Sequence, residues 1–306
     1  MTIKSNHPGI YKALIAQLDK TARHNRQGSF RTKERYYDAM KRFCRFLADH
    51  FHLQKLANVS GKHLTAYVLY MQEQGMSVST IKTDLAAIRF FHDKMERTKY
   101  HLPSNDELAV ELERRRFGGV DRTWSVREFN LFLATCMADG HEDFAAIACL
   151  TWYAGLRIHE CFRIDTAIAE QALRENAITV KGKGGKVRTV PINGSIRIEL
   201  EKFLAVTPRG HKLFVPEVVQ THHAIAQLQQ YIYKMRPQIQ DEDSTRPMTH
   251  HGLRHSFAAR TWRELVDSGV SPLNASLRVS QLLGHERPDV THTYLASVPK
   301  DGGAHG

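Results

Sequence analysis

The stretch 248–294 constrains the fold of this chain most, because it carries four polar side chains in a fixed order, three of them at the spacing of one helix face. If its first turns are helical, His251, Arg254 and His255 lie on one face, since positions three and four apart are neighbours on a helix. The planar guanidinium of Arg254 suits two oxygens of one phosphate. Tyr294 follows and supplies a hydroxyl that could attack the phosphorus. The sequence therefore indicates a phosphate-handling site built on a helix.

The first hundred residues predict a bundle of helices. Apolar residues recur at helical spacing in the segments 8–24, 32–50 and 60–74, and in a fourth segment that begins after Ser77 or Ser79. In the fourth segment the apolar stripe leaves Lys82 and Arg89 on other faces of the helix. We interpret the stripes as the core of the bundle.

The net charge of +11 is concentrated in this helical part of the chain. Residues 1–117 hold 21 Lys and Arg against 12 Asp and Glu, whereas the remainder holds 22 against 20. Such an asymmetry indicates a polyanionic partner, and a compact bundle with a basic surface suits the backbone of a DNA duplex. The simpler reading, that these side chains only keep the helices in solution, stays open at this point.

A linker is predicted at residues 114–122, between a first domain at 1–113 and a second domain at 123–306. Arg114, Arg115 and Arg116 stand shortly before a pair of glycines, a pattern typical of a hinge. The three arginines either contact phosphate or belong to a solvated connector.

The second domain begins with helical signals. Ser125 and Glu128 form a capping box at a helix start. A strongly apolar segment at 144–153 predicts a buried helix that ends in a glycine turn directly before Arg157. An arginine in this place can be held rigidly with its head group in a cleft.

A β-hairpin is predicted after these helices. Residues 177–180 and 187–192 alternate like strands, and the glycine-rich, lysine-bearing segment 181–186 joins them. Glycines allow such a tip to approach another backbone closely. With further helices around 195–206 and 222–236, the predicted fold class is α+β and mostly helical.

The composition argues against a membrane or secreted protein. No apolar run approaches the ~20 residues of a membrane span, and the N-terminus lacks the apolar core of a signal peptide. The four cysteines form no close pair, which predicts buried, reduced thiols in a cytoplasmic protein; they are Cys44, Cys136, Cys149 and Cys161.

The 18 histidines raise the question of a metal site. His251 and His255 are four residues apart and could bind zinc from one helix face. The residues between them lack the glutamate of a zinc protease helix, and the charge of Arg254 would repel a cation. We therefore predict no metal ion and no other cofactor.

Five motifs resemble those of the tyrosine recombinase (phage integrase) family, in particular its compact Xer-like members. They are Ala154-Gly155-Leu156-Arg157 with Glu160, the hairpin 182–188 that carries Lys183, the box His251-Gly252-Leu253-Arg254-His255, the segment 282–285 that ends in His285, and Tyr294 nine residues later. Each motif alone is weak evidence, but five in this order are highly specific. The resemblance assigns residues from about 30 to 100 to a helical, SAM-like core-binding domain and residues from about 122 to 295 to the catalytic domain.

The resemblance also implies a role for each motif residue. Arg157 and Arg254 would bind the non-bridging oxygens of the scissile phosphate. Tyr294 would attack the phosphorus, forming a 3′-phosphotyrosyl link and releasing a 5′-hydroxyl. A free tyrosine has a pKa of about 10, so His251 is expected to accept its proton. Lys183 would protonate the departing oxygen as general acid.

The remaining predicted site residues support the reaction or hold the DNA. His285 would hydrogen-bond the phosphate, while Glu160 and His255 would brace the site. The predicted DNA contacts are Lys82, Arg89, Arg114, Arg115, Arg116, Lys186 and Arg188.

The function implied is site-specific recombination of double-stranded DNA with paired inverted repeats. It would be carried out in the cytoplasm, in association with the nucleoid, by a homotetramer of bacterial or phage origin. An accessory factor that sets the direction of the reaction is a further expectation. The covalent intermediate keeps the phosphodiester energy, so no nucleotide hydrolysis is needed. Two alternatives stay open: a type IB topoisomerase-like relaxing enzyme and a non-catalytic DNA-binding regulator.

Overall fold

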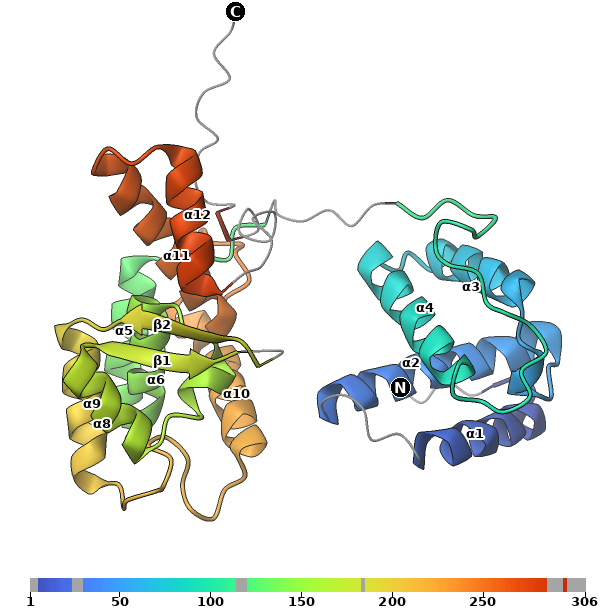
Figure 1. Ribbon diagram of the computed structural model, residues 1–306, viewed down its shortest axis with the longest axis horizontal. Coiled ribbons are helices and arrows are strands. Elements are labelled where there is room, and N and C mark those ends of the chain that lie inside the picture. Colours follow the sequence, from blue (N-terminus) through green and yellow to red (C-terminus); the bar gives the residue numbers. More distant parts are fainter. Residues whose placement is uncertain (1–4, 24–29, 114–119, 183–184, 285–293, 296–306) are drawn as a thin grey trace, which may run out of the picture. The chain divides into compact units, whose positions relative to one another are not determined.

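The computed structural model describes residues 5–23, 30–113, 120–182, 185–284 and 294–295, with only the backbone of Phe30 and Arg31. The chain forms two compact units, residues 1–116 and residues 117–306 (Figure 1). The boundary lies within the predicted linker. Each unit has its own hydrophobic core.

The first unit is a bundle of helices, as the apolar stripes predict. Its elements are α1 (Pro8–Arg23), α2 (Phe30–Phe51), the short 3₁₀ helix η1 (Leu56–Asn58), α3 (Gly61–Glu73) and α4 (Val78–His92). Helix α2 packs against α1 and α4. Ser77, one of the two predicted caps, accepts a hydrogen bond from the Thr80 backbone at 3.2 Å.

A buried carboxylate joins three helices of this bundle. Asp84 on α4 accepts hydrogen bonds from the Arg42 guanidinium on α2 at 2.7 and 3.1 Å, and from the Tyr67 hydroxyl on α3 at 2.9 Å. Because a buried charge is costly unless it is paired, this arrangement specifies how the three helices pack.

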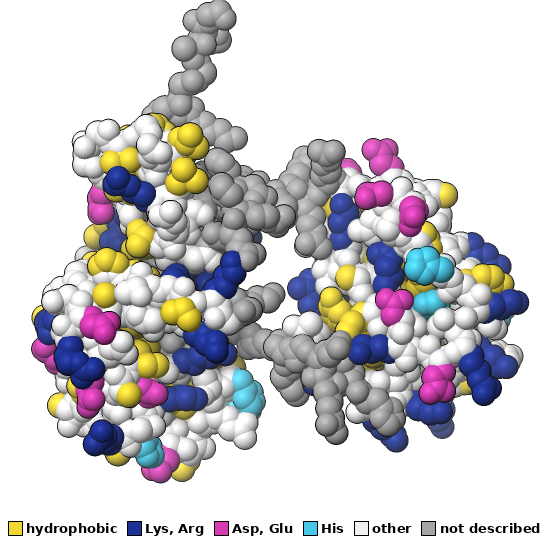
Figure 2. All heavy atoms as spheres, in the orientation of Figure 1, with side chains coloured by type: hydrophobic (Ala, Val, Ile, Leu, Met, Phe, Trp, Pro, Cys, Tyr) yellow, Lys and Arg dark blue, Asp and Glu magenta, His cyan; other side chains and the backbone are white. Residues whose placement is uncertain are grey.

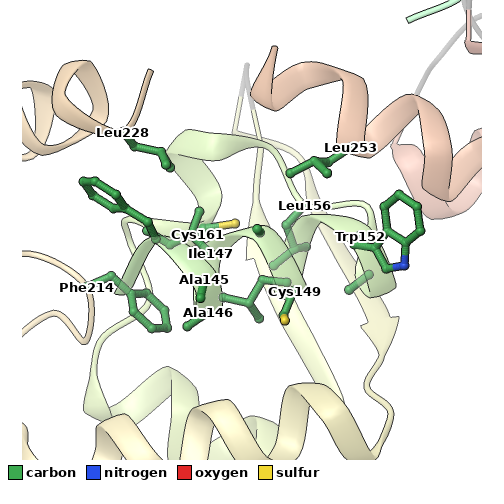
Figure 3. Close-up of a cluster of buried hydrophobic side chains, with 14 of the residues drawn as sticks. Ala145, Ala146, Ile147, Cys149, Trp152, Leu156, Cys161, Phe214, Leu228 and Leu253 are labelled. Carbon is green, nitrogen blue, oxygen red and sulfur yellow. The ribbon is translucent and has the colours of Figure 1, made fainter. Parts of the chain in front are cut away.

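The second unit is built around one helix that is buried along nearly its whole length, α6 (Glu142–Ala154). Packed against it are α5 (Val126–Ala138), α7 (Ile158–Cys161), α9 (Gly194–Val206) and α11 (His250–Asp267). The remaining helices are α8 (Thr166–Glu175), α10 (Thr221–Ile239) and α12 (Pro272–Leu283). Figure 3 shows the core around α6, where Ile147 lies among side chains from other helices, Leu228 and Leu253 among them.

A single antiparallel hairpin lies beside these helices, formed by β1 (Ala177–Lys181) and β2 (Val187–Pro191). Ile178 pairs with Val190 and both side chains are buried, so one face of the hairpin belongs to the core. The described residues thus confirm the predicted fold class, mostly helical with one small antiparallel hairpin. The four cysteines are buried and unpaired, as predicted.

Helix length and hydropathy also bear on membrane insertion. Among the helices that the structure describes, none combines the length and the apolar character needed to cross a bilayer.

Candidate active site

Helix α11 carries three of the predicted site residues on one face. The rings of His251 and His255 lie 5.2 Å apart, with Arg254 between them in the sequence. Gly252 allows a close approach at the start of this helix: a Cβ atom at this position would lie 2.3 Å from the Arg122 carbonyl oxygen. The glycine of this motif is therefore required for close packing of α11 against the segment before α5.

Arg254 is completely buried and forms hydrogen bonds to the C-terminal ends of two helices. Its guanidinium donates hydrogen bonds to the carbonyl oxygens of Gly155, after α6, and of Leu283, at the end of α12. Gly155 has a φ of 61°, a left-handed conformation that favours glycine. Burial lowers the pKa of Arg254 to about 10, so the side chain remains protonated at pH 7.

Tyr294 meets all three α11 residues although it lies about forty positions further along the chain. Its ring stacks on His255 at a centroid distance of 4.3 Å and lies over the Arg254 guanidinium at 5.6 Å. Its hydroxyl is 3.1 Å from Nε2 of His251. Only 7% of the tyrosine is exposed. The structure thus brings together four residues that the sequence predicted as one site.

His251 is placed to accept the tyrosine proton. Burial, and then the charges of Arg254 and Arg157, lower the pKa of His251 to about 4. The imidazole is therefore neutral at pH 7, and with its proton on Nδ1 it presents Nε2 as an acceptor to the Tyr294 hydroxyl. This arrangement fits the role of general base predicted for His251.

Arg157 follows the Gly155 turn and lines a cleft with a volume of about 480 Å³. Its backbone N–H donates to Glu160 at 2.7 Å and its Nη1 donates to the same carboxylate at 3.0 Å. With 22% of its side chain exposed, Arg157 is more accessible than Arg254. Arg157, His251 and Arg254 all line the cleft, so the two arginines and the proposed base share one binding space.

Glu160 is the buried anion that holds this part of the site. Besides the two bonds from Arg157, it accepts one hydrogen bond at each oxygen from the guanidinium of Arg188, both at 2.7 Å. Burial alone would raise the pKa of Glu160, but the bonds and charges of Arg188 and Arg157 lower it to about 2.

This low pKa predicts a pH-dependent contribution to stability. A carboxyl group with a pKa near 4.5 when unfolded and about 2 when folded stabilises the fold above pH 4.5 and loses that effect as the pH falls through 2. The linkage relation gives about 3 kcal/mol at neutral pH, of which about 2 kcal/mol is lost by pH 3. The difference in unfolding free energy between wild type and Glu160→Gln, from urea titrations, should shrink by that amount between pH 6 and pH 3.

The matched control for this experiment is Glu201→Gln. Glu201 pairs with Arg197 on the surface of α9, where 52% of its side chain is exposed. Exposed ion pairs contribute little to stability. The difference in unfolding free energy between wild type and Glu201→Gln should therefore stay nearly constant over the same pH range. A flat difference for Glu160→Gln as well would show that the carboxylate is not stabilised as the contacts indicate.

The structure places the predicted DNA contacts in different surroundings. Arg188 faces Glu160 rather than solvent, and only 10% of its side chain is exposed. Lys82 donates to the Glu113 carbonyl oxygen at 2.8 Å. Arg89 donates to the Pro103 carbonyl and to Asn105, at 2.7 and 2.8 Å. Lys186 is exposed at the hairpin tip.

Five predicted site residues lie outside the described part of the chain: Lys183, His285, Arg114, Arg115 and Arg116. The hairpin residue next to Lys183 does lie in the site. A Cβ atom on Gly182 would be 3.4 Å from the Glu160 carboxylate and 3.5 Å from the Arg157 guanidinium. In the described residues, no group of three or more His, Cys, Asp or Glu side chains is arranged to hold a metal ion.

The sequence reasoning missed one wall of the cleft. Gln229, Tyr233 and Arg236 line it from α10, a helix that the sequence had suggested only as scaffold. These three residues recur four and three positions apart, which is the spacing of one helix face. That regular polar stripe was the available signal. His159, next to Glu160 in the sequence, also lines the cleft.

Comparisons with known proteins match both units. Residues 126–300 match the phage integrase family, and residues 14–102 match the SAM-like N-terminal domain of phage integrases. A tyrosine recombinase XerD of Halalkalibacterium halodurans is 26% identical over 86% of this chain and 86% of its own length. A tyrosine recombinase XerC of Vibrio vulnificus is 29% identical over 96% of this chain and 90% of its own.

Solved structures show the same fold. A lambda integrase in a tetramer bound to a Holliday junction has a TM-score of 0.65 at 16% identity, covering 94% of this chain and 79% of that chain. A lambda integrase in a dimer bound to a core site has a TM-score of 0.64, also at 16% identity, covering 94% and 97%.

Proposed function

Because this chain belongs to the phage integrase family of tyrosine recombinases, we propose that it is a site-specific recombinase that cleaves and rejoins DNA through a 3′-phosphotyrosyl intermediate. The observation that carries the proposal is the contact of the Tyr294 hydroxyl with Nε2 of His251, at 3.1 Å, in a tyrosine whose ring centroid lies 5.6 Å from the guanidinium of Arg254. A hydroxyl, a neutral base and a fixed positive charge are thereby placed together where a phosphate could enter the cleft.

The reaction begins with attack by the tyrosine. The Tyr294 oxygen forms a bond to the scissile phosphorus while its proton passes to Nε2 of His251. The bond from phosphorus to the 5′-oxygen breaks, and Lys183 supplies the proton to that oxygen. Attack of a 5′-hydroxyl from a second strand on the phosphotyrosine then reverses each of these steps and rejoins the DNA.

The two arginines stabilise the charge that develops on the phosphate. Arg157 is partly exposed in the cleft and donates from the open side. Arg254 lies beneath the tyrosine ring and acts from the floor of the site, where burial strengthens its interaction with an anion. His285 joins them as a further donor to the phosphate.

Lys183 is assigned the role of general acid on the position of its neighbour. A Cβ atom on Gly182 would lie close to the Arg157 guanidinium and the Glu160 carboxylate, so the residue before Lys183 borders the site. The ammonium group of a lysine at the next position has enough reach to meet the leaving oxygen beside Arg157.

Residues 1–113 form the proposed core DNA-binding domain, residues 114–122 the linker and residues 123–306 the catalytic domain. The excess of Lys and Arg in residues 1–117 supports backbone contact by the first domain. On the face in Figure 2, dark-blue Lys and Arg side chains lie on both units, interspersed with acidic ones. Lys82, Arg89, Lys186 and the arginines of the linker are the proposed contacts.

The lambda integrase tetramer on a Holliday junction supports a homotetramer as the active assembly of this chain. Paired inverted repeats in the DNA would then match the symmetry of the protein. The proposal places the enzyme with bacterial DNA in the cytoplasm. Nucleoid association and an accessory factor that sets direction remain predictions.

A selection in the presence of excess EDTA tests the function and its independence of metal. The cations of the proposed site are Arg157, Arg254 and Lys183, which take the place of the divalent ions used by other phosphoryl-transfer enzymes. When nicked duplexes of random sequence are offered, covalent protein–DNA adducts should form and should be enriched in a specific sequence. Cleavage that requires added metal would contradict the mechanism.

The same selection separates the alternatives. Adducts without sequence enrichment, together with relaxation of any supercoiled plasmid, would indicate a type IB topoisomerase-like enzyme. Specific binding in a gel shift without any adduct would indicate a DNA-binding regulator. Enrichment of one half-site, followed by strand exchange between two plasmids that carry paired copies, is the result expected for a recombinase.

A further inference from the structure

Arg188 joins three segments that carry site residues. It lies on β2 of the hairpin, and its guanidinium donates hydrogen bonds to residues outside the hairpin. Its two terminal nitrogens donate to the two oxygens of Glu160 on α7, each at 2.7 Å. Its Nε donates to the Leu282 carbonyl oxygen at the end of α12, at 2.9 Å. One planar guanidinium therefore connects the hairpin to the Arg157 segment and to the end of α12.

We propose that Arg188 is a positioning residue of the cleavage reaction, which fixes the β1–β2 hairpin against α7 and α12 so that Lys183 meets the leaving oxygen. The inference deepens the proposed function and rests on the role of Lys183 as general acid. It also replaces the direct DNA contact predicted for Arg188, because its donors already serve Glu160 and Leu282.

The hairpin needs such an anchor at its tip end. A two-stranded hairpin is only marginally stable by itself. Ile178, Val180 and Val190 are buried in the core, whereas Lys181 and Val187, which flank the tip, are exposed. Arg163 adds a long hydrogen bond of 3.5 Å to the Lys181 carbonyl oxygen. The side chain of Arg188 therefore supplies short hydrogen bonds that join this end of the hairpin to both neighbouring segments.

The environment of Arg188 is shaped for an arginine. Gly284 caps α12 with a φ of 65°, and a Cβ atom there would lie 2.9 Å from Cδ of Arg188. The glycine thus leaves space for the arginine stem. A lysine at position 188 could reach one of the three acceptors, but its ammonium group cannot donate to both Glu160 oxygens and to Leu282 in the same planar geometry.

Removal of the Arg188 guanidinium should disturb the position of Lys183 more than the position of Arg157. Arg157 keeps its own two bonds to Glu160, from its backbone nitrogen and from Nη1. The hairpin, in contrast, loses its attachment to both neighbouring segments. A displacement of about 1 Å in a catalytic group can cost roughly 10²-fold in rate. The defect should therefore be confined to protonation of the leaving group.

The test compares two leaving groups. With full-length Arg188→Gln, single-turnover cleavage of a nicked suicide substrate with the ordinary 5′-oxygen should slow by roughly 10²-fold. On the same substrate with a 5′-bridging sulfur, which leaves without protonation, most of that loss should disappear. The Lys183→Ala variant should show the same pattern, and the double variant should be no slower than Lys183→Ala alone, because the two residues act on one step.

Arg197→Gln is the matched control. Arg197 also donates to three acceptors, Glu201, the Leu173 carbonyl and Asn176, but it lies on α9. The Arg197→Gln variant should cleave both substrates at the wild-type rate. Arg188→Lys serves as a second variant if Arg188→Gln does not fold, and urea unfolding of each variant establishes that the compared proteins are folded.

The outcomes separate the inference from the function on which it rests. If sulfur rescues Lys183→Ala but not Arg188→Gln, the positioning role is wrong and the general acid stands. If sulfur rescues neither variant, the assignment of Lys183 fails. If Arg188→Gln instead lowers the slope of log affinity against log salt by about 0.9, the arginine contacts a DNA phosphate and the inference is overturned.

Discussion

A chain that carries Tyr294→Phe should bind its DNA site with nearly wild-type affinity and form no covalent adduct with it. The substitution removes one oxygen, and with it the attacking atom and the contact with Nε2 of His251. The phenylalanine ring can still stack on His255 and lie over Arg254, so the fold should lose only about 1 kcal/mol. A nicked suicide substrate, whose short fragment diffuses away after cleavage, measures adduct formation directly.

Tyr233→Phe is the informative control, because Tyr233 lines the cleft together with Arg157 and Arg254, and 68% of it is exposed. If it were the nucleophile, its hydroxyl would be accessible to a phosphate that Arg157 and Arg254 hold. The adduct should persist in this variant, and peptide mapping should find the DNA on Tyr294. An adduct mapped to Tyr233, or one that survives Tyr294→Phe, would overturn the assignment.

The parts of the site that the sequence predicts best are those fixed by local geometry. His251, Arg254 and His255 share a helix face because of their spacing, and any helix over this stretch would place them together. The hairpin follows from alternation of apolar residues on either side of a glycine-rich tip. The buried course of α6 follows from an apolar run too short to span a membrane and too continuous to face water on one side.

Contacts between distant residues could not be predicted in the same way. Nothing in the spacing of Arg188 shows that it pairs with Glu160, 28 positions away, because the pairing depends on where the hairpin docks. The charge of Arg188 therefore predicted a contact with DNA, whereas in the folded chain its guanidinium donates hydrogen bonds to Glu160. Likewise, the spacing alone does not show that Arg254 binds the Gly155 carbonyl, 99 positions away.

The order of motifs along the chain supplied what local geometry could not. Tyr294 alone is indistinguishable from a core aromatic, and its ring is in fact buried against His255 and Arg254. Its distance from His285 in the sequence identified it, although His285 lies outside the described residues. The structure shows how a buried tyrosine is compatible with the proposed role of nucleophile: the hydroxyl, unlike the ring, faces a neutral acceptor at His251.

Arg254→Lys should damage both stability and activity, because one guanidinium holds two buried carbonyl groups and has a proposed role in the reaction. A lysine keeps the charge but cannot donate to the Gly155 and Leu283 carbonyls in one plane. We expect a loss of about 2–4 kcal/mol in unfolding free energy, from unpaired buried carbonyls and a poorly solvated ammonium group. Cleavage should fall by roughly 10²–10³-fold or more, the cost of removing one donor from a transition state.

Arg260→Lys shows whether the loss of activity merely reflects the loss of stability. Arg260 lies on the same helix, donates to the Trp152 carbonyl and stacks over the Trp152 ring at 4.1 Å, so its replacement also removes a partly buried guanidinium. It should destabilise the fold and leave single-turnover cleavage near the wild-type rate at a temperature where both variants are folded. If both variants lost activity in proportion to stability, Arg254 would be a structural residue only. The two substitutions make the same chemical change on the same helix. If only Arg254→Lys loses cleavage activity beyond its loss of stability, Arg254 must stabilise the reacting phosphate directly.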